Sequence, residues 1–159
     1  MDSVFWIIER SLCGRPGPAE SPWNVNELYD GGIRAIISLD QDDVDHQAIN
    51  DAGIEHMSFA LPDSIPPTDE DATLWQKVLP QAFNYIKKWT SDSQGAIMVH
   101  CHAGKDRTGV LLGSYLTIVE GLDPKDAFSR LRVARPVAMT SEGYEAFFFD
   151  LMYKIKHQR

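Results

Sequence analysis

The segment from residue 96 to residue 121 constrains the fold more than any other part of this chain. It begins with the apolar run AIMVH, passes through the polar string CHAGKDRT, and continues as GVLLGSYLTIVEG. The last piece is apolar on nearly every face of a helix, and such a helix belongs in the interior of a protein. We therefore expect a buried strand at 96–100, a polar loop, and then a central buried helix.

Hydrophobic periodicity elsewhere alternates between strands and helices. Apolar and β-branched runs predict strands at residues 4–8, 33–39 and 54–61, and the stretch 14–24, rich in Pro and Gly, is typical of a loop. Thr68 and the pair Asp123-Pro124 are typical helix starts. Helices are expected at residues 24–32, 42–51, 68–89, 123–135 and 141–156.

Strands separated by helices predict an α/β fold, with a central, mainly parallel β-sheet of about four to five strands flanked by helices. The 159 residues suit one domain with a sizeable core. The chain has no internal repeat and no linker long enough to divide it. We therefore expect a single domain over residues 1–159.

Composition limits the partners. The net charge of −8 argues against a general nucleic-acid binder, although a small pocket on an acidic protein can still attract an anion. Two cysteines, Cys13 and Cys101, favour a reduced, intracellular setting over a disulfide framework. The start MDSVFWIIER lacks the features of a signal peptide, and no run approaches the roughly 20 apolar residues of a membrane span. We expect a cytoplasmic monomer without stable membrane anchoring.

The polar string lies between a strand and a helix, the position at which α/β folds bind anions. It is not a nucleotide-binding P-loop, because Val99 stands where the first glycine belongs and Asp106 follows Gly104-Lys105. What remains is a cysteine, five residues and an arginine, followed by a threonine. Backbone N–H groups of the loop would encircle a phosphoryl group. The candidate binding residues are His102, Ala103, Gly104, Lys105, Asp106 and Arg107.

The spacing assigns a task to each side chain around this loop. The N–H groups and the helix N-terminus favour a thiolate at Cys101, which makes it a candidate nucleophile. Arg107 can clamp two phosphoryl oxygens with its planar guanidinium. Gly104 permits the tight turn, and the hydroxyl of Thr108 can donate to the cysteine sulfur when it departs. His100 can orient Cys101 from behind.

The string HCHAGKDRTG resembles the signature loop of the cysteine-dependent protein tyrosine phosphatase superfamily, in its dual-specificity form. The segments FWIIERSLCG, GIRAIISL, LPDSIPP and RLRVARP are similar, in order, to those of VHZ-like small atypical dual-specificity phosphatases. The resemblance covers nearly the whole chain. It implies a phosphatase-like fold and a hydrolase that needs no metal or other cofactor and forms a cysteinyl-phosphate intermediate.

The resemblance also implies a general acid, and LPDSIPP matches the family segment that carries it, which points to Asp63. Asp106 competes for this role, because some lipid phosphatases have an aspartate at this place. Lys105 matches a lysine of phosphoinositide phosphatases, whereas His102 stands where their second loop lysine would be. Lys105 and Asp106 are equally consistent with a surface ion pair.

These observations lead to one main hypothesis and two alternatives. We expect hydrolysis of phosphotyrosine, and of phosphoserine and phosphothreonine, in proteins or peptides. An inositol phosphate or a phosphoinositide is the alternative substrate. A silent phosphate-binding module ranks lower, because Cys101 and Arg107 are both present. A metal site at residues 100–102 is not expected, since neighbouring strand residues point to opposite faces and no partner motif exists.

Overall fold

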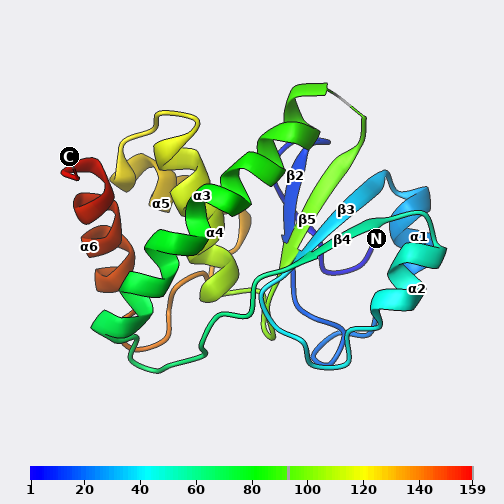
Figure 1. Cartoon of the computed structure of the whole chain (residues 1–159), viewed down its shortest axis with the longest axis horizontal. Helices are drawn as coiled ribbons and strands as arrows, with labels where there is room; N and C mark the ends of the chain where they lie inside the picture. Colours follow the sequence, from blue (N-terminus) through cyan, green and yellow to red (C-terminus); the bar gives the residue numbers. More distant parts are fainter. Residues whose placement is uncertain (93, 159) are drawn as a thin grey trace.

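A computed structural model describes residues 1–92 and 94–158 of the chain (Figure 1). A central sheet separates α1 and α2 on one side from α3 to α6 on the other. The elements are β1 (Phe5–Ile8), β2 (Leu12–Arg15), α1 (Val25–Asp30), β3 (Ile33–Ser38), α2 (His46–Asp51), β4 (Glu55–Ser58), α3 (Asp69–Asp92), β5 (Ala96–His100), α4 (Arg107–Ile118), α5 (Pro124–Ala134) and α6 (Tyr144–Lys156).

The sheet has five strands in the order β1-β2-β5-β3-β4. Only β1 runs antiparallel to its neighbour β2, whereas all other pairs are parallel. Strand β5 is central, and its last residue His100 lies level with Arg15 of β2 and Ser38 of β3. The predicted α/β class with a mainly parallel sheet is therefore confirmed, and the carboxyl ends of three strands meet at one edge.

Side-chain alternation along the central strand fills two separate apolar clusters. Ile97 and Val99 of β5 point into the larger cluster, which α3 to α6 cover. Ala96 and Met98 point into the smaller one, which α1 and α2 cover. Every residue of β5 is buried, as a strand covered on both faces should be.

The central helix and two predicted helix starts are confirmed. All residues of α4 from Arg107 to Thr117 are buried. At the start of α3, the Thr68 hydroxyl accepts from the Asp71 N–H at 3.1 Å while the Asp71 carboxylate accepts from the Thr68 N–H at 2.9 Å. Asp123 caps α5, with Pro124 in the first turn. These caps satisfy backbone donors that the first helical turn leaves unpaired.

Strand β2 includes Gly14 and Arg15, for which the sequence pattern predicts a loop, so the prediction is wrong there. The run LCGR has neither the β-branched residues nor the alternation of a typical strand. Pairing on both sides, with β1 and β5, imposes the extended conformation instead. Several boundaries also differ by a few residues, such as the start of α2 at His46. No helix in the described part of the chain has the length and apolarity needed to cross a membrane.

The contact between α4 and α6 leads to a test of core packing. A Cβ atom at Gly113 would lie 2.9 Å from Cε1 of the buried Phe148 ring. Alanine favours a helix over glycine by about 1 kcal/mol, but overpacking a core costs about 1–3 kcal/mol. We expect Gly113→Ala to lower the free energy of unfolding by up to about 2 kcal/mol in urea titrations.

The neighbouring Ser114 offers a matched control on the same helix. Its buried hydroxyl has no hydrogen-bond partner among the described residues. Removing such a group creates no unpaired partner, so Ser114→Ala should leave stability unchanged or raise it. A Gly113→Ala variant about 1 kcal/mol more stable than the wild type would show that α6 can move away from α4 without cost.

Candidate active site

The signature loop, defined here as residues 101–107, joins the end of β5 to the start of α4. Cys101 is only 3% exposed and lies at the bottom of this junction. A pocket of about 160 Å³ opens above it. The residues that line the pocket are Asp63, Ile65, Cys101, His102, Ala103, Lys105, Asp106, Arg107 and Ser141. The structure therefore brings seven of the predicted site residues to one pocket, together with Ile65 and Ser141, which the sequence analysis did not select.

Outside donors hold the carbonyl groups of the signature loop. Gly17 N–H donates to the His102 carbonyl at 2.9 Å, and Met139 N–H donates to the Lys105 carbonyl at 3.0 Å. The Arg135 guanidinium donates to the carbonyls of residues 103 and 104 at 2.8 and 3.2 Å. A trans peptide places its N–H opposite its C=O. The N–H groups of residues 103–106 are thereby directed toward the inside of the loop, where an anion would lie.

Gly104 is the turning point of the loop. Its φ is +66°, in the left-handed region that favours glycine. A Cβ atom there would also lie 2.5 Å from the backbone nitrogen of Pro16. Both observations support the predicted role of Gly104 in the tight turn, and they show that strand β2 packs directly against the loop.

Arg107, the first residue of α4, is buried and anchored by groups from two other segments. Its guanidinium donates to the carbonyls of Leu39 and Leu61 at 3.2 and 3.0 Å. It also donates to the Asp40 carboxylate at 2.8 Å, and Asp63 Oδ2 lies 3.7 Å away. These contacts hold the guanidinium rigidly at the wall of the pocket, so a phosphoryl group would meet a pre-positioned positive charge.

Burial and neighbouring charge act in opposite directions on this ion pair. Burial alone would lower the pKa of Arg107, but negative charge at Cys101, Asp40 and Asp63 raises it. Burial alone would raise the pKa of Asp40, but the Asp42 N–H and the guanidinium hold it below its usual range. Both partners therefore stay charged near neutral pH.

The sequence analysis did not select Asp40, although a usable signal was present. Asp40 comes two residues after the end of β3, and Ser38 at that end lies level with His100. Side chains that follow neighbouring parallel strands meet at the same edge of a sheet. An acidic residue that directly follows the strand predicted at residues 33–39 is therefore a candidate partner for an arginine in the signature loop.

Asp63 and Asp106 both reach the pocket, in different environments. Asp63 lies on the segment between β4 and α3, and its side chain is 60% exposed. Asp106 is buried, and Lys105 Nζ lies 3.1 and 3.0 Å from its two carboxylate oxygens. Lys105 also donates to the Ser141 hydroxyl at 2.6 Å. Lys105 and Asp106 thus form the ion pair that the sequence left open, in a partly buried rather than a surface position.

Two predicted contacts around the nucleophile have different outcomes. His100 is fully buried behind Cys101, and its Nδ1 lies 2.9 Å from the Cys101 carbonyl oxygen. The Thr108 hydroxyl is also buried, but it has no hydrogen-bond partner among the described residues. The structure therefore does not contain the predicted bond from Thr108 to the cysteine sulfur.

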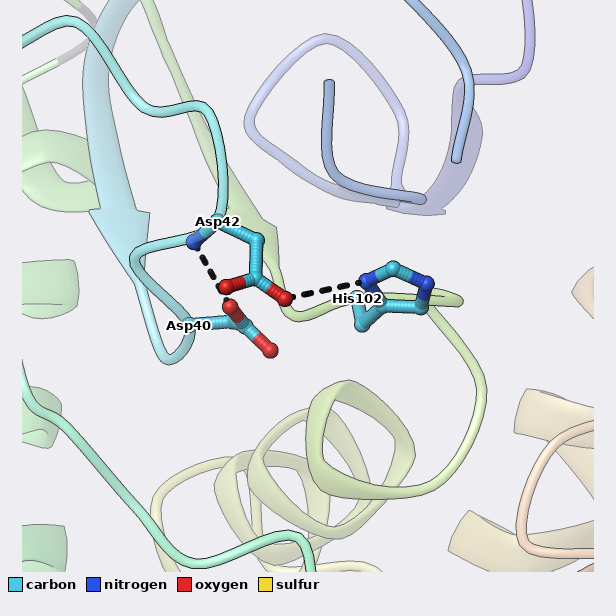
Figure 2. Close-up of side chains that lie close together, drawn as sticks. All are labelled: Asp40, Asp42 and His102. Carbon is cyan, nitrogen blue, oxygen red and sulfur yellow. Dashed lines mark hydrogen bonds and ion pairs between the residues drawn. The ribbon is translucent and has the colours of Figure 1, made fainter. Parts of the chain in front are cut away.

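Asp40, Asp42 and His102 form a cluster (Figure 2), with one polar atom from each lying within 4.8 Å of the others, and His102 also lines the pocket. Asp40 already has protein partners, whereas the buried Nδ1 of His102 has no hydrogen-bond partner among the described residues. Asp40 binds Arg107 and accepts from the Asp42 N–H at 2.8 Å. His102 lies 3.5 Å from Asp42 and 3.4 Å from Glu20. We interpret the cluster as the polar rim that supports Arg107.

Cys13 and Cys101 are both free and buried, on opposite sides of the sheet. Cys13 belongs to the smaller apolar cluster, and its thiol donates to the Ile97 carbonyl at 3.7 Å. Burial strongly raises the pKa of this thiol. Cys13 is therefore an inert core residue, which leaves Cys101 as the reactive cysteine of the site.

Comparison with known proteins agrees with this geometry. Residues 22–153 match the family described as "Dual specificity phosphatase, catalytic domain". The chain belongs to the dual specificity phosphatase catalytic domain family. This match spans β3, β4, β5, the signature loop, helices α1 to α5 and most of α6, and it confirms the family that the signature string indicated.

Relatives of this phosphatase domain differ in length. The "Dual specificity protein phosphatase CDC14AB" of Danio rerio is 31% identical over 143 residues, which cover 82% of this chain and 22% of that protein. The "Protein tyrosine phosphatase PRL-1" of Leishmania major is 26% identical, with 90% of this chain and 80% of that protein covered. The active form of Tk-PTP has the same fold, with a TM-score of 0.77 at 20% identity over 96% of this chain and 98% of that one.

The buried His100 makes a prediction about acid stability. Burial is the main cause that lowers its pKa from 6.5 to about 4. Between those values the unfolded chain takes up a proton that the folded chain does not, so stability falls as the pH falls. The slope reaches at most about 1.4 kcal/mol per pH unit. We expect His100→Asn, which keeps a donor near Cys101, to flatten this slope in urea titrations between pH 7 and 4.5.

The comparison uses slopes rather than absolute stabilities, because His100→Asn also leaves a small cavity. His157→Gln, at an exposed histidine of the C-terminal region, should keep the wild-type slope. Parallel curves for His100→Asn and the wild type would contradict the assignment of a neutral His100.

Proposed function

We propose that this chain is a metal-independent phosphatase that hydrolyses phosphomonoesters of proteins, phosphotyrosine foremost, through a cysteinyl-phosphate intermediate. The observation that carries the proposal is the placement of Cys101 and Arg107 on one pocket, beneath a loop whose N–H groups turn inward. The guanidinium and the N–H groups together supply the positive charge that phosphoryl transfer requires.

The first step transfers the phosphoryl group to sulfur. The Cys101 thiolate attacks phosphorus, an S–P bond forms, and the P–O bond to the leaving group breaks. Arg107 binds two of the three remaining phosphoryl oxygens as negative charge spreads over them. The leaving oxygen needs a proton as this bond breaks. In the second step, water attacks phosphorus, and phosphate leaves the regenerated thiolate. Thr108 is proposed to donate to that thiolate once it departs.

Asp63 is the proposed proton donor of the first step and the base for water in the second. It lines the pocket, its carboxylate lies 3.7 Å from Arg107, and it is accessible to a substrate that enters from solvent. Asp106 is less suited, because Lys105 occupies both of its oxygens and the Ser141 N–H lies 3.3 Å from one of them. A carboxylate held in this way is not free to deliver a proton to a leaving group.

The same ion pair supports protein substrates over inositol phosphates. Lys105 lines the pocket, and this observation keeps the inositol reading as a second candidate. Its charge, however, is directed at Asp106 and Ser141. A multiply phosphorylated ring would have to break these contacts to use Lys105. The match covers only 22% of the length of the zebrafish relative, so the substrates of that longer protein are not carried over to this chain.

The direct test is phosphate release from four substrates compared side by side without added metal. They are a phosphotyrosine peptide, a phosphothreonine peptide, an inositol polyphosphate and a short-chain phosphoinositide. We expect the peptides to be preferred and Cys101→Ser to reduce turnover by roughly 10⁴-fold or more, because the nucleophile is lost. Vanadate binding to that variant should survive, since the loop and Arg107 remain.

The outcomes separate the candidates. Preference for the inositol compounds would make Lys105 a specificity residue. Undiminished turnover by Cys101→Ser would overturn the mechanism. Silence of the wild-type chain on all four substrates, with vanadate still bound, would leave a phosphate-binding module.

A second experiment assigns the general acid. Asp63→Asn should lower kcat by about 10²-fold for an alkyl or phenyl phosphate, whose leaving oxygen needs a proton. The loss should be much smaller for p-nitrophenyl phosphate, whose leaving group departs as an anion. Asp106→Asn should show no such dependence on the leaving group. The reverse order of the two variants would move the acid role to the signature loop.

A further inference from the structure

Four side chains form a continuous hydrogen-bonded chain from the protein surface to the backbone of the nucleophile. His46 of α2 is exposed, and its Nδ1 lies 2.6 Å from Nδ1 of His56 on β4. His56 Nε2 lies 2.8 Å from the Ser38 hydroxyl, which in turn lies 2.6 Å from His100 Nε2. His100 Nδ1 completes the chain at the Cys101 carbonyl oxygen, 2.9 Å away. The chain crosses three neighbouring strands of the sheet.

The direction of each hydrogen bond in this chain follows from its inner end. A carbonyl oxygen can only accept, so His100 must carry its proton on Nδ1 and donate it to Cys101. Neutral His100 then accepts at Nε2, and only the Ser38 hydroxyl can donate there. The Ser38 oxygen is consequently free to accept the Nε2–H of His56. The Cys101 carbonyl at Nδ1 and the Ser38 hydroxyl at Nε2 thus both favour the one tautomer of His100 that reaches the nucleophile.

The outer end of the chain is determined in the same way. His56 donates through Nε2, so its Nδ1 accepts the proton carried by His46 Nδ1. His46 Nε2 then accepts from the Asn50 side-chain N–H, 2.9 Å away. All five donors therefore point from the surface toward Cys101, and every ring along the chain is neutral. The hydrogen bonds in such a series polarise one another, so a charge at one end changes the electrostatic potential at the other.

The His46–His56 pair is the place where such a charge would enter. Two imidazolium rings would direct two protons at each other across 2.6 Å, so the pair takes up only one extra proton. That proton sits on His46 Nε2 when Asn50 rotates its amide to present oxygen. The directions along the rest of the chain stay unchanged. The added positive charge then favours negative charge at the far end, where the Cys101 thiolate lies.

We propose that Ser38, His56 and His46 are positioning residues for Cys101, which fix the tautomer of His100 and transmit the charge of the surface histidine pair to the nucleophile. The proposal rests on the proposed function in so far as Cys101 is the nucleophile. Through these contacts, the protonation state of the surface pair would affect the balance between thiol and thiolate at the nucleophile.

The charged groups around this series of hydrogen bonds favour placing the extra proton on His46 and His56 rather than on His100. Burial keeps the pKa of His100 low, with the nearby His56 and Arg15 of β2 acting in the same direction, while the hydrogen bond to the Cys101 carbonyl and the charge of Asp40 act against them. Burial followed by His46 lowers the pKa of His56. The nearest acidic groups on the outer elements have other partners. Glu55 on β4 pairs with Lys88 of α3 at 3.5 Å, and the Asp45 carboxylate caps α2 through the Ala48 N–H.

The test measures the rate of Cys101 alkylation by iodoacetamide in the full chain between pH 5 and 9. This reagent is uncharged and reports the thiolate without any turnover. Ser38→Ala breaks the chain beside His100. The double variant His46→Asn, His56→Gln keeps polar atoms near the Nδ1 and Nε2 positions but removes both titratable rings. His157→Gln is the matched control, and Cys101→Ser gives the background from Cys13.

We expect Ser38→Ala and the double variant to react with iodoacetamide at least about threefold more slowly than the wild type at pH 5.5, and at the wild-type rate at pH 9. His157→Gln should superimpose on the wild type. Two-bond ¹H–¹⁵N spectra of the histidine rings add a second readout. His100 should carry its proton on Nδ1 in the wild type and the double variant, and this preference should weaken in Ser38→Ala, where only the Cys101 carbonyl still favours it. The double variant also keeps the test valid if Ser38→Ala fails to fold.

Superimposable alkylation profiles for the wild type and the double variant would overturn the transmission of charge. A wild-type His100 protonated on Nε2 would overturn the positioning role. These failures are distinct from a failure of the proposed function, because neither readout requires a phosphatase reaction. If the two variants alter the alkylation profile as expected but the protein releases no phosphate, only the proposed function is contradicted.

Discussion

The guanidinium of Arg107 is the contact on which the rest of the site depends. It begins α4, yet it donates to the carbonyls of Leu39 and Leu61 and to the Asp40 carboxylate. These acceptors belong to the segments that follow β3 and β4, so one side chain joins three parts of the carboxyl edge of the sheet. Its loss would leave buried acceptors unpaired, which costs more than a missing surface contact. Binding of phosphate and integrity of the pocket therefore rest on the same group.

The chain carries a net charge of −8, yet two of the acidic groups at the anion-binding pocket are paired with basic side chains. Asp40 is neutralised by Arg107, and Asp106 by Lys105. Inward N–H groups of the signature loop add partial positive charge without adding ionisable groups. The local field is thus set by how charges are paired at a few ångströms, whereas net charge governs only the long-range field that salt screens.

The sequence was most informative where local chemistry decides the structure. The strand at 96–100, the loop, the buried helix after it and the caps at Thr68 and Asp123 all follow from patterns within a few residues. Prediction from the sequence failed where the structure depends on contacts between residues far apart in the chain. Strand β2 exists because β1 and β5 pair with it, and the partner of Arg107 lies 67 positions away at Asp40. The hydroxyl of Thr108 shows the opposite limit, since its place after Arg107 predicts a bond to the cysteine sulfur, yet it has no hydrogen-bond partner among the described residues.

The pairing register of β3 with β5 explains why the two supports of the nucleophile come from one neighbouring strand. Ser38 lies level with His100 and contacts it behind Cys101. Asp40, two residues further along, reaches Arg107 in front of Cys101. A shift of one residue in this register would turn Ser38 to the other face of the sheet, because side chains alternate with a period of two. It would also displace Asp40 from the guanidinium. The buried apolar residues of β3 and β5, which fix this register on both faces, therefore determine the geometry of the site as well as the stability of the core.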